Sequence, residues 1–294
     1  MKLSSIRRPM GDYLLLNLSE IAVLADVLGL SWGSPEKNQR IETAIQLTAK
    51  HLAPLVSGVV LGPELGFSAV NMLPEPSGLL LTLTKQTALT KPEDLPIFEP
   101  NWGVTHVRNN YAVLYSKVLY HPHDVSATEK LQLFAELNDA CAYEGIQSVL
   151  ELVLYQTKGE EPGVEKFQEK QLSTVREFQQ LANLLVLEYP QTALAAATLT
   201  ASLDSPWLVR ITEKDHAQTK TVLRTALESG SSGIVLRYEN LFSGLRLDNH
   251  PKPDKTDEFF EWFEHLITTE VRDRVLEISR ILSEVRTKSE ITHN

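Results

Sequence analysis

Short apolar runs alternate with longer amphipathic stretches along most of the chain. Buried strands of a parallel sheet read as continuous apolar runs, whereas helices repeat apolar positions at steps of three and four residues. The helical repeat is clear, for example, in residues 41–55 and 127–143. We predict eight strands, at Tyr13–Leu18, Gly58–Leu61, Gly78–Thr82, Ala112–Tyr120, Ser148–Leu154, Leu184–Tyr189, Trp207–Thr212 and Gly233–Tyr238.

This alternation predicts parallel strands joined by right-handed helical crossovers. Two architectures fit it, a closed (β/α)8 TIM barrel and an open, doubly wound sheet, and the pattern alone does not separate them.

We expect one domain over residues 1–294, with a helical C-terminal region at 256–288. The apolar run in that region covers more than half a helical turn and predicts a homo-oligomer, a dimer, unless the barrel itself buries the run. Its members are Phe259, Phe260, Trp262, Phe263 and Leu266.

Composition narrows the functional classes. A net charge of −10 argues against a nucleic-acid-binding surface, but it leaves room for one pocket that binds a small anionic ligand. The single cysteine, Cys141, cannot form an intrachain disulfide, so a reduced, cytoplasmic protein is the expectation. No apolar run has the length of a membrane span, and the first residues lack the apolar core of a signal peptide. We expect no cofactor.

One segment, Leu184-Leu185-Val186-Leu187-Glu188-Tyr189-Pro190, is similar to the sixth barrel strand of the class I aldolases that cleave tagatose bisphosphate and sulfofructose phosphate. The resemblance covers most of the chain, because further matches follow in the family's order. They lie at residues 57–66, 78–81, 119–122, 150–153, 205–209 and 228–233. The resemblance implies a (β/α)8 barrel, with the chemistry at the C-terminal ends of its strands.

The positions that hold substrate in that family are changed here. Val186 stands at the position of the Schiff-base lysine, and a valine cannot form an imine. Asn17 and Gly62 stand where the family has aspartates. Glu213 replaces a phosphate-binding glycine, and Arg237 is displaced by one residue from the family's arginine. The resemblance therefore implies an aldolase scaffold whose sugar-phosphate aldolase activity is lost or altered.

Two functions follow. In the first, the barrel is a ligand-binding or interaction module. In the second, it is an active carbon–carbon lyase whose Schiff base has moved to Lys117, in the otherwise apolar run 114–120. If position 115 points into the barrel, Lys117 does too, one layer nearer the mouth. The other interpretation of Lys117 is a buried structural ion pair with Glu151 or Glu188.

The remaining candidates each have two interpretations. Glu151 and Glu188 are either a general acid/base pair or scaffold acids that balance Lys117 and Arg210. Arg210 and Arg237 either bind an anion or pair with Glu213 and Glu239. The run His121-Pro122-His123-Asp124 resembles a metal motif, but no second ligand cluster accompanies it. We therefore expect no metal there, and we regard His121 and Asn17 as candidate ligand-binding residues.

Overall fold

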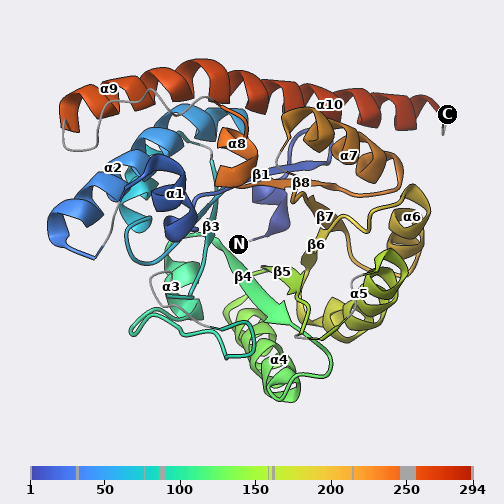
Figure 1. Cartoon of the computed structure of the whole chain (residues 1–294). Coiled ribbons are helices and arrows are strands. Elements are labelled where there is room, and N and C mark those ends of the chain that lie inside the picture. Colours follow the sequence, from blue (N-terminus) through green and yellow to red (C-terminus); the bar gives the residue numbers. More distant parts are fainter. Residues whose placement is uncertain are drawn as a thin grey trace.

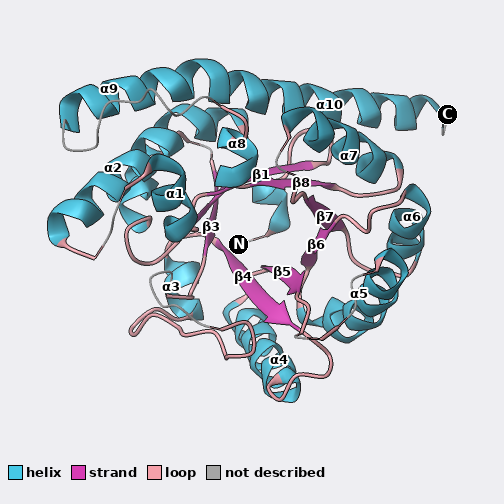
Figure 2. Ribbon diagram, in the orientation of Figure 1, coloured by secondary structure: helices cyan, strands magenta, loops and turns pink. Residues whose placement is uncertain are grey.

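The computed structural model describes residues 2–30, 33–75, 77–85, 91–157, 159–160, 163–213, 215–245 and 256–292. Eight parallel strands pair in sequence order and close into a barrel (Figures 1 and 2). The strands are β1 (Tyr13–Asn17), β2 (Gly58–Leu61), β3 (Gly78–Leu81), β4 (Val113–Tyr120), β5 (Ser148–Leu154), β6 (Leu184–Glu188), β7 (Trp207–Arg210) and β8 (Gly233–Leu236). The (β/α)8 barrel is confirmed, and the open-sheet interpretation is wrong.

Helices surround the barrel and cover the outer faces of its strands (Figure 2). The α-helices are α1 (Ile21–Leu28), α2 (Pro35–Leu52), α3 (Val104–Asn109), α4 (Ala127–Glu144), α5 (Val164–Phe178), α6 (Ala193–Ala201), α7 (His216–Glu228), α8 (Tyr238–Phe242), α9 (Thr256–Leu266) and α10 (Arg272–Thr292). Short 3-10 turns lie at η1 (Leu3–Ile6), η2 (Ala53–Leu55), η3 (Phe67–Met72) and η4 (Gln179–Leu181). No helix among these residues is both long and apolar enough to span a membrane.

The inside of the barrel is a separate apolar core. It is formed by inward-facing strand residues and by η1, which closes the end of the barrel where the strands begin. A Cβ on Gly78, the first residue of β3, would lie 2.7 Å from Ile6 Cγ2 and 2.5 Å from a backbone oxygen, so only glycine fits against this plug. Val186 and Tyr115 both belong to this core. The side chain of Val186 therefore points into the barrel.

The C-terminal helical region was predicted correctly, and α9 and α10 run as one rod across the barrel (Figure 1). A single π-helical turn, Ile267–Val271, joins them. Phe259, Phe263 and Leu266 are buried against the barrel. Phe260 and Trp262 are half-buried and pack against the same core. The chain itself therefore covers most of the apolar run on which the expected dimer was based.

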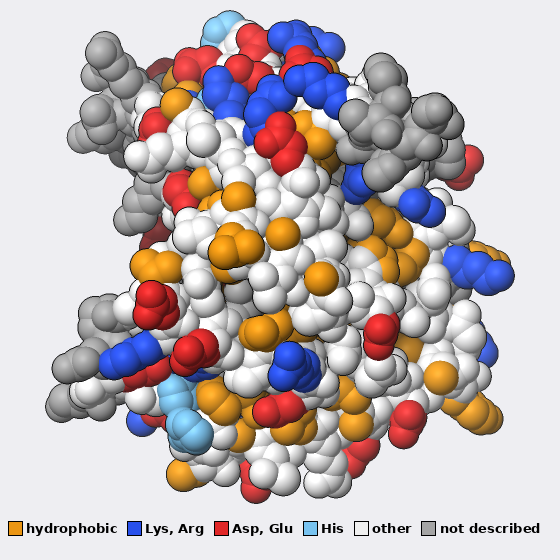
Figure 3. Space-filling view, turned by 90° about the vertical axis from the view of Figure 1, so that its right-hand side faces the viewer, with side chains coloured by type: hydrophobic (Ala, Val, Ile, Leu, Met, Phe, Trp, Pro, Cys, Tyr) orange, Lys and Arg blue, Asp and Glu red, His pale blue; other side chains and the backbone are white. Residues whose placement is uncertain are grey.

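The flank of the barrel that carries α5, α6 and α7 has an uneven charge distribution. Charged side chains gather over the C-terminal rod, while the middle of this face is largely uncharged (Figure 3). The rod is bound to α7 by ion pairs, with Lys220 Nζ 2.6 Å from Glu277 Oε1 and Arg224 Nη2 2.8 Å from Glu284 Oε2. Exposed pairs of this kind contribute little stability each, so the rod is held mainly by its buried apolar residues, which are mostly aromatic in α9 and aliphatic in α10.

Candidate functional site

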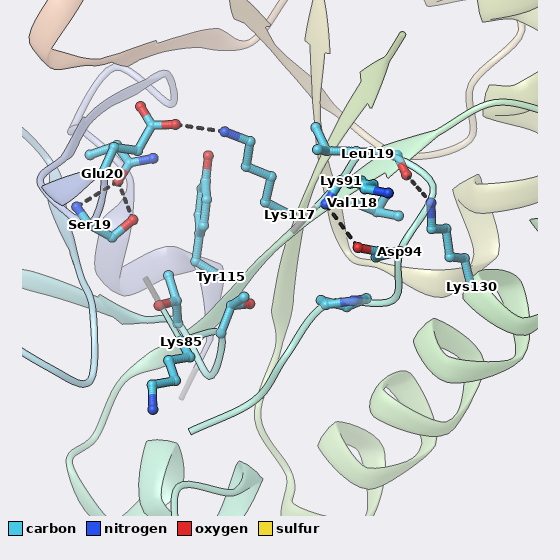
Figure 4. A pocket seen from close by; sticks show the side chains of 14 residues that line it. Ser19, Glu20, Lys85, Lys91, Asp94, Tyr115, Lys117, Val118, Leu119 and Lys130 are labelled. Atoms are coloured by element: carbon cyan, nitrogen blue, oxygen red, sulfur yellow. Dashed lines mark hydrogen bonds and ion pairs between the residues drawn. The ribbon is translucent and has the colours of Figure 1, made fainter. Parts of the chain in front are cut away.

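Three charged side chains meet, one from β4 and two from the segments that follow β1 and β8. Glu20 directly precedes α1, Lys117 lies on β4, and Arg237 directly follows β8. Lys117 Nζ is 2.6 Å from Glu20 Oε1, as Figure 4 shows. Arg237 approaches the same carboxylate with two nitrogens, Nε at 2.6 Å from Oε2 and Nη2 at 3.0 Å from Oε1. We call these three residues the Glu20 group.

The Glu20 carboxyl is ionised although it is buried. Burial opposes its ionisation, but Lys117 and Arg237 outweigh burial and hold the pKa of the Glu20 carboxyl at about 2. Lys117 was expected to pair with Glu151 or Glu188, and that prediction is wrong. Closure of the barrel places Glu20, 97 positions earlier in the chain, against the lysine instead.

A second set of charges lies at the middle of β5 and at the ends of β6 and β7, and we call it the Arg210 group. Arg210 Nε is 3.0 Å from Glu151 Oε1, and Arg210 Nη1 is 3.0 Å from Glu188 Oε2. Tyr115 donates a hydrogen bond of 2.8 Å from its hydroxyl to Glu151 Oε2. Burial raises the pKa of Glu188, and Arg210 opposes that rise.

One interpretation of Arg210 and Arg237 paired them with Glu213 and Glu239. Arg237 does pair with Glu239, with Nη2 3.0 Å from Oε1, in addition to Glu20. Arg210 pairs with the two strand acids, Glu151 and Glu188, so its expected pairing with Glu213 is wrong. Glu151 and Glu188 balance Arg210 as predicted for scaffold acids, although they do not balance Lys117.

A cavity of about 190 Å³ opens beside the Glu20 group. Its walls come from β1, β4 and α4, from the segment that follows β3 and from residues 91–96, and none of the Arg210 group lines it (Figure 4). Four lysines and two acids contribute charge to its lining, which gives a surplus of two positive charges. They are Lys85, Lys91, Lys117, Lys130, Glu20 and Asp94. The cavity therefore favours an anionic occupant.

Asn17, a predicted ligand-binding residue, lies in the wall of this cavity. It is only 1% exposed, and its Oδ1 accepts hydrogen bonds from the backbone N–H of Ser19 at 2.9 Å and from the Ser19 hydroxyl at 2.7 Å. Arg237 does not line the cavity but contacts Glu20, which does. The structure thus brings together Asn17 and Lys117 and places Arg210 elsewhere.

His121, the other predicted ligand-binding residue, lies outside the cavity lining. Its Nε2 is 3.2 Å from Glu160 Oε2, and its Nδ1 accepts a hydrogen bond of 3.2 Å from the backbone N–H of His123. Asp124 accepts a hydrogen bond from the Tyr155 hydroxyl and lies 3.6 Å from Lys130 Nζ. Within the described ranges, no three His, Cys, Asp or Glu side chains are arranged to hold a metal ion.

The sequence did not identify Glu20 and Lys130 as residues of the site, nor the charged cavity residues Lys85, Lys91 and Asp94. Lys130 is fully buried, and its Nζ donates to the backbone oxygens of Pro92 at 2.6 Å and Leu119 at 2.9 Å. Burial lowers the pKa of Lys130, and Asp124 opposes that shift. The only sequence signal for the burial of Lys130 was its position, because it lies on the same helix face as the buried Phe134, one turn earlier. Lys130 fixes one wall of the cavity by binding the 91–96 segment.

Comparison with known proteins identifies the scaffold. No family model and no curated protein matches the chain. Among solved structures, an archaeal fructose 1,6-bisphosphate aldolase is 15% identical, with a TM-score of 0.64 over 94% of this chain and 97% of that one. A protein from Corynebacterium glutamicum is 15% identical, with a TM-score of 0.65 over 94% and 87%. These likenesses show that the chain shares the (β/α)8 barrel fold of the two structures.

A fructose-bisphosphate aldolase from Slackia heliotrinireducens is similar as well, 13% identical with a TM-score of 0.59 over 95% of this chain and 87% of that one. Another similar structure, again an archaeal fructose-1,6-bisphosphate aldolase, carries its catalytic lysine covalently bound to a carbinolamine intermediate. At 14% identity this likeness shows the fold alone. The narrower resemblance to tagatose-bisphosphate and sulfofructose-phosphate aldolases stays a prediction.

Proposed function

We propose that this aldolase-like barrel binds a small anionic molecule in the cavity at its mouth and no longer cleaves sugar phosphates through a Schiff base. The surplus of positive charge in the cavity lining supports the anionic ligand. The position of the cavity supports the site, because barrels of this class place their function where the strands end.

The observation that carries the proposal is the state of the amines inside the barrel. On β6, the residue at the predicted position of the Schiff-base lysine is Val186, which has no amine and belongs to the apolar core. Lys117 offers an amine at the cavity, but the ionised Glu20 carboxylate lies 2.6 Å from it. The Lys117 amine is therefore held in an ion pair, which would have to be broken before the nitrogen could attack a substrate carbonyl.

A second candidate function is an aldolase that uses Lys117 as a relocated Schiff-base nucleophile. One observation favours it, since the Lys117 side chain is 33% exposed and lines the cavity, so a substrate carbonyl can reach it. Glu151 and Glu188 would then have to supply acid/base chemistry, yet both are bound to Arg210 and neither lines the cavity. The first function is therefore the better supported.

Two variants of Lys117 separate these functions. Arginine keeps the positive charge but cannot form an imine, whereas methionine removes the charge. We expect no release of triose phosphate from fructose 1,6-bisphosphate or tagatose 1,6-bisphosphate by the unmodified protein. We also expect Lys117→Arg to retain anion binding measured by calorimetry, and Lys117→Met to lose it. Cleavage by the unmodified protein that Lys117→Arg abolishes would establish the lyase instead.

The assembly and the location of the protein are also parts of this proposal. A homodimer remains our expectation, and its support is the half-buried pair Phe260 and Trp262 of α9. A cytoplasmic location is supported by the single buried thiol of Cys141, which suits a reducing compartment. Sedimentation equilibrium over the micromolar range tests the dimer, and a species of 33.0 kDa throughout would rule it out.

A further inference from the structure

The cavity contains a hydrogen-bond donor that no described residue uses. The Oδ1 of Asn17 accepts from the backbone N–H of Ser19, and an N–H cannot bond to the NH₂ end of an amide. This contact fixes the orientation of the amide and leaves Nδ2 as its other end. None of the described residues accepts a hydrogen bond from Nδ2, although Asn17 is only 1% exposed. Because Asn17 lines the cavity, this nitrogen is available to an acceptor that enters it.

A second donor faces the same cavity from β4. Lys117 Nζ carries three hydrogens and gives one to Glu20 Oε1. The remaining hydrogens are available at the cavity, where the Lys117 side chain is 33% exposed. The Asn17 amide and the Lys117 ammonium thus contribute N–H groups to one cavity from β1 and from β4, and both can donate to oxygen acceptors.

We infer that the cavity binds a short organic carboxylate, whose oxygens accept from Asn17 Nδ2 and Lys117 Nζ. This inference rests on the proposed function and names the class of its ligand. Lys117 already shares its charge with Glu20, and Asn17 is neutral, so the two donors together match a single negative charge. A phosphate dianion would bring twice that charge close to the Glu20 carboxylate, which lines the same cavity.

The size of the cavity limits the ligand further. An apolar cavity of about 150 Å³ accommodates benzene, which has six non-hydrogen atoms. A volume of about 190 Å³ therefore suits a ligand of about six to eight non-hydrogen atoms. Pyruvate, lactate and 3-hydroxybutyrate, which each carry one negative charge at neutral pH, are suitable probes, and inorganic phosphate and glycerol 3-phosphate represent the competing class.

The substitution Asn17→Asp isolates the unused donor. Aspartate keeps one oxygen to accept from both Ser19 donors, and it replaces only the Nδ2 donor with a negatively charged acceptor. The matched control is Asn109→Asp, which makes the same change in charge at an exposed position at the end of α3. Calorimetric titration of each protein with the five probes, at one ionic strength, measures the effect.

We expect the unmodified protein to bind at least one of the carboxylates at least tenfold more tightly than either phosphate. Asn17→Asp should weaken carboxylate binding at least tenfold, and Asn109→Asp should leave it unchanged. Lys117→Met is the second variant and should weaken carboxylate binding as well, which keeps the test valid if Asn17→Asp does not fold.

Three results would overturn the inference. They are tighter binding of phosphates than of carboxylates, unchanged carboxylate affinity in a folded Asn17→Asp variant, and unchanged carboxylate affinity in Lys117→Met. The first two leave the anion-binding function in place and reject only the ligand class or the role of Asn17. Failure of all five probes to bind the unmodified protein would reject the proposed function together with this inference.

Discussion

The two charged groups at the barrel mouth are opposites in composition. In the Glu20 group, one acid is shared by two cations, Lys117 and Arg237. In the Arg210 group, one cation is shared by two acids, Glu151 and Glu188. The cavity borders the Glu20 group and avoids the Arg210 group. The mouth is therefore polarised, and the side with spare donors is the side that a ligand can reach.

This difference separates a structural role from a binding role. Glu151 is 0% exposed and also accepts from Tyr115, so the Arg210 group is built into the barrel core. Lys117 in the Glu20 group is partly exposed at the cavity. Disruption of the Arg210 group should therefore affect stability first, whereas changes at the cavity side of the Glu20 group should affect binding first.

The largest expected effect is that of Arg210→Met. It leaves Glu151 and Glu188 near each other without a cation, so it should lower the free energy of unfolding by roughly 3 to 5 kcal/mol. Urea denaturation at pH 7 measures this loss. The control is Arg224→Met, which breaks an exposed pair with Glu284 and should cost less than about 1 kcal/mol. Equal losses of unfolding free energy in the two variants would show that the Arg210 group contributes no more to stability than an exposed ion pair does.

Glu20→Gln should have a smaller effect, roughly 2 kcal/mol at pH 7, because Arg237 retains Glu239 and Lys117 is partly hydrated. The pH dependence of this loss in stability tests the assigned ion pairs of Glu20. The pKa of Glu20 falls from 4.5 to about 2 on folding, so its contribution is fully present above pH 4.5 and is lost as pH falls through 2. The stability difference between the unmodified protein and Glu20→Gln should therefore shrink steadily between pH 4.5 and 2. A difference that stays constant down to pH 2.5 would contradict the assigned ion pairs.

Lys117→Met should have the smallest effect on stability, less than about 1 kcal/mol, since Glu20 keeps both contacts with Arg237. The same variant should lose the anion affinity of the cavity. Thermal unfolding and calorimetric titration of one preparation measure the two effects together. Large destabilisation would mean that Lys117 belongs to the structural core, as the members of the Arg210 group do.

No gain in activity is expected from Val186→Lys. The new amine would lie in the apolar core, opposite Glu151 in the pairing of β5 with β6. It would lack the residues that hold substrate, because catalytic groups act as a unit and one restored member recovers little rate. A coupled assay for triose phosphate release from tagatose 1,6-bisphosphate checks this. Measurable cleavage would show that the scaffold has kept more of an aldolase site than we infer.

The fold was largely predictable because parallel strands buried on both faces carry continuous apolar runs. Gly58–Leu61 and Ser148–Leu154 were predicted with their observed bounds. Tyr238 was assigned to the last strand but begins α8, since a short buried helix has the same apolar character as a strand end. Closure of the barrel could not be decided by the pattern and came from the family resemblance.

The partners of the charged residues were less predictable. Lys117 and Glu20 are far apart in sequence, and their contact exists only because barrel closure brings the ends of β1 and β4 together. Glu151 was the more obvious partner for Lys117, because the two residues lie opposite each other in the register of β4 and β5. The Glu151 carboxylate instead forms an ion pair with Arg210. Strand patterns predict which face a side chain takes, but the choice among several acids at one mouth depends on the full three-dimensional arrangement.

The central claim is that the mouth holds its ligand without a covalent bond to Lys117. Borohydride reduction in the presence of dihydroxyacetone phosphate or pyruvate, followed by intact-mass measurement, tests this most directly, because reduction converts an imine into a stable adduct. The account predicts an unchanged mass under conditions in which calorimetry shows a carboxylate bound. A mass increase that maps to the peptide containing Lys117, and that disappears in Lys117→Arg, would contradict it.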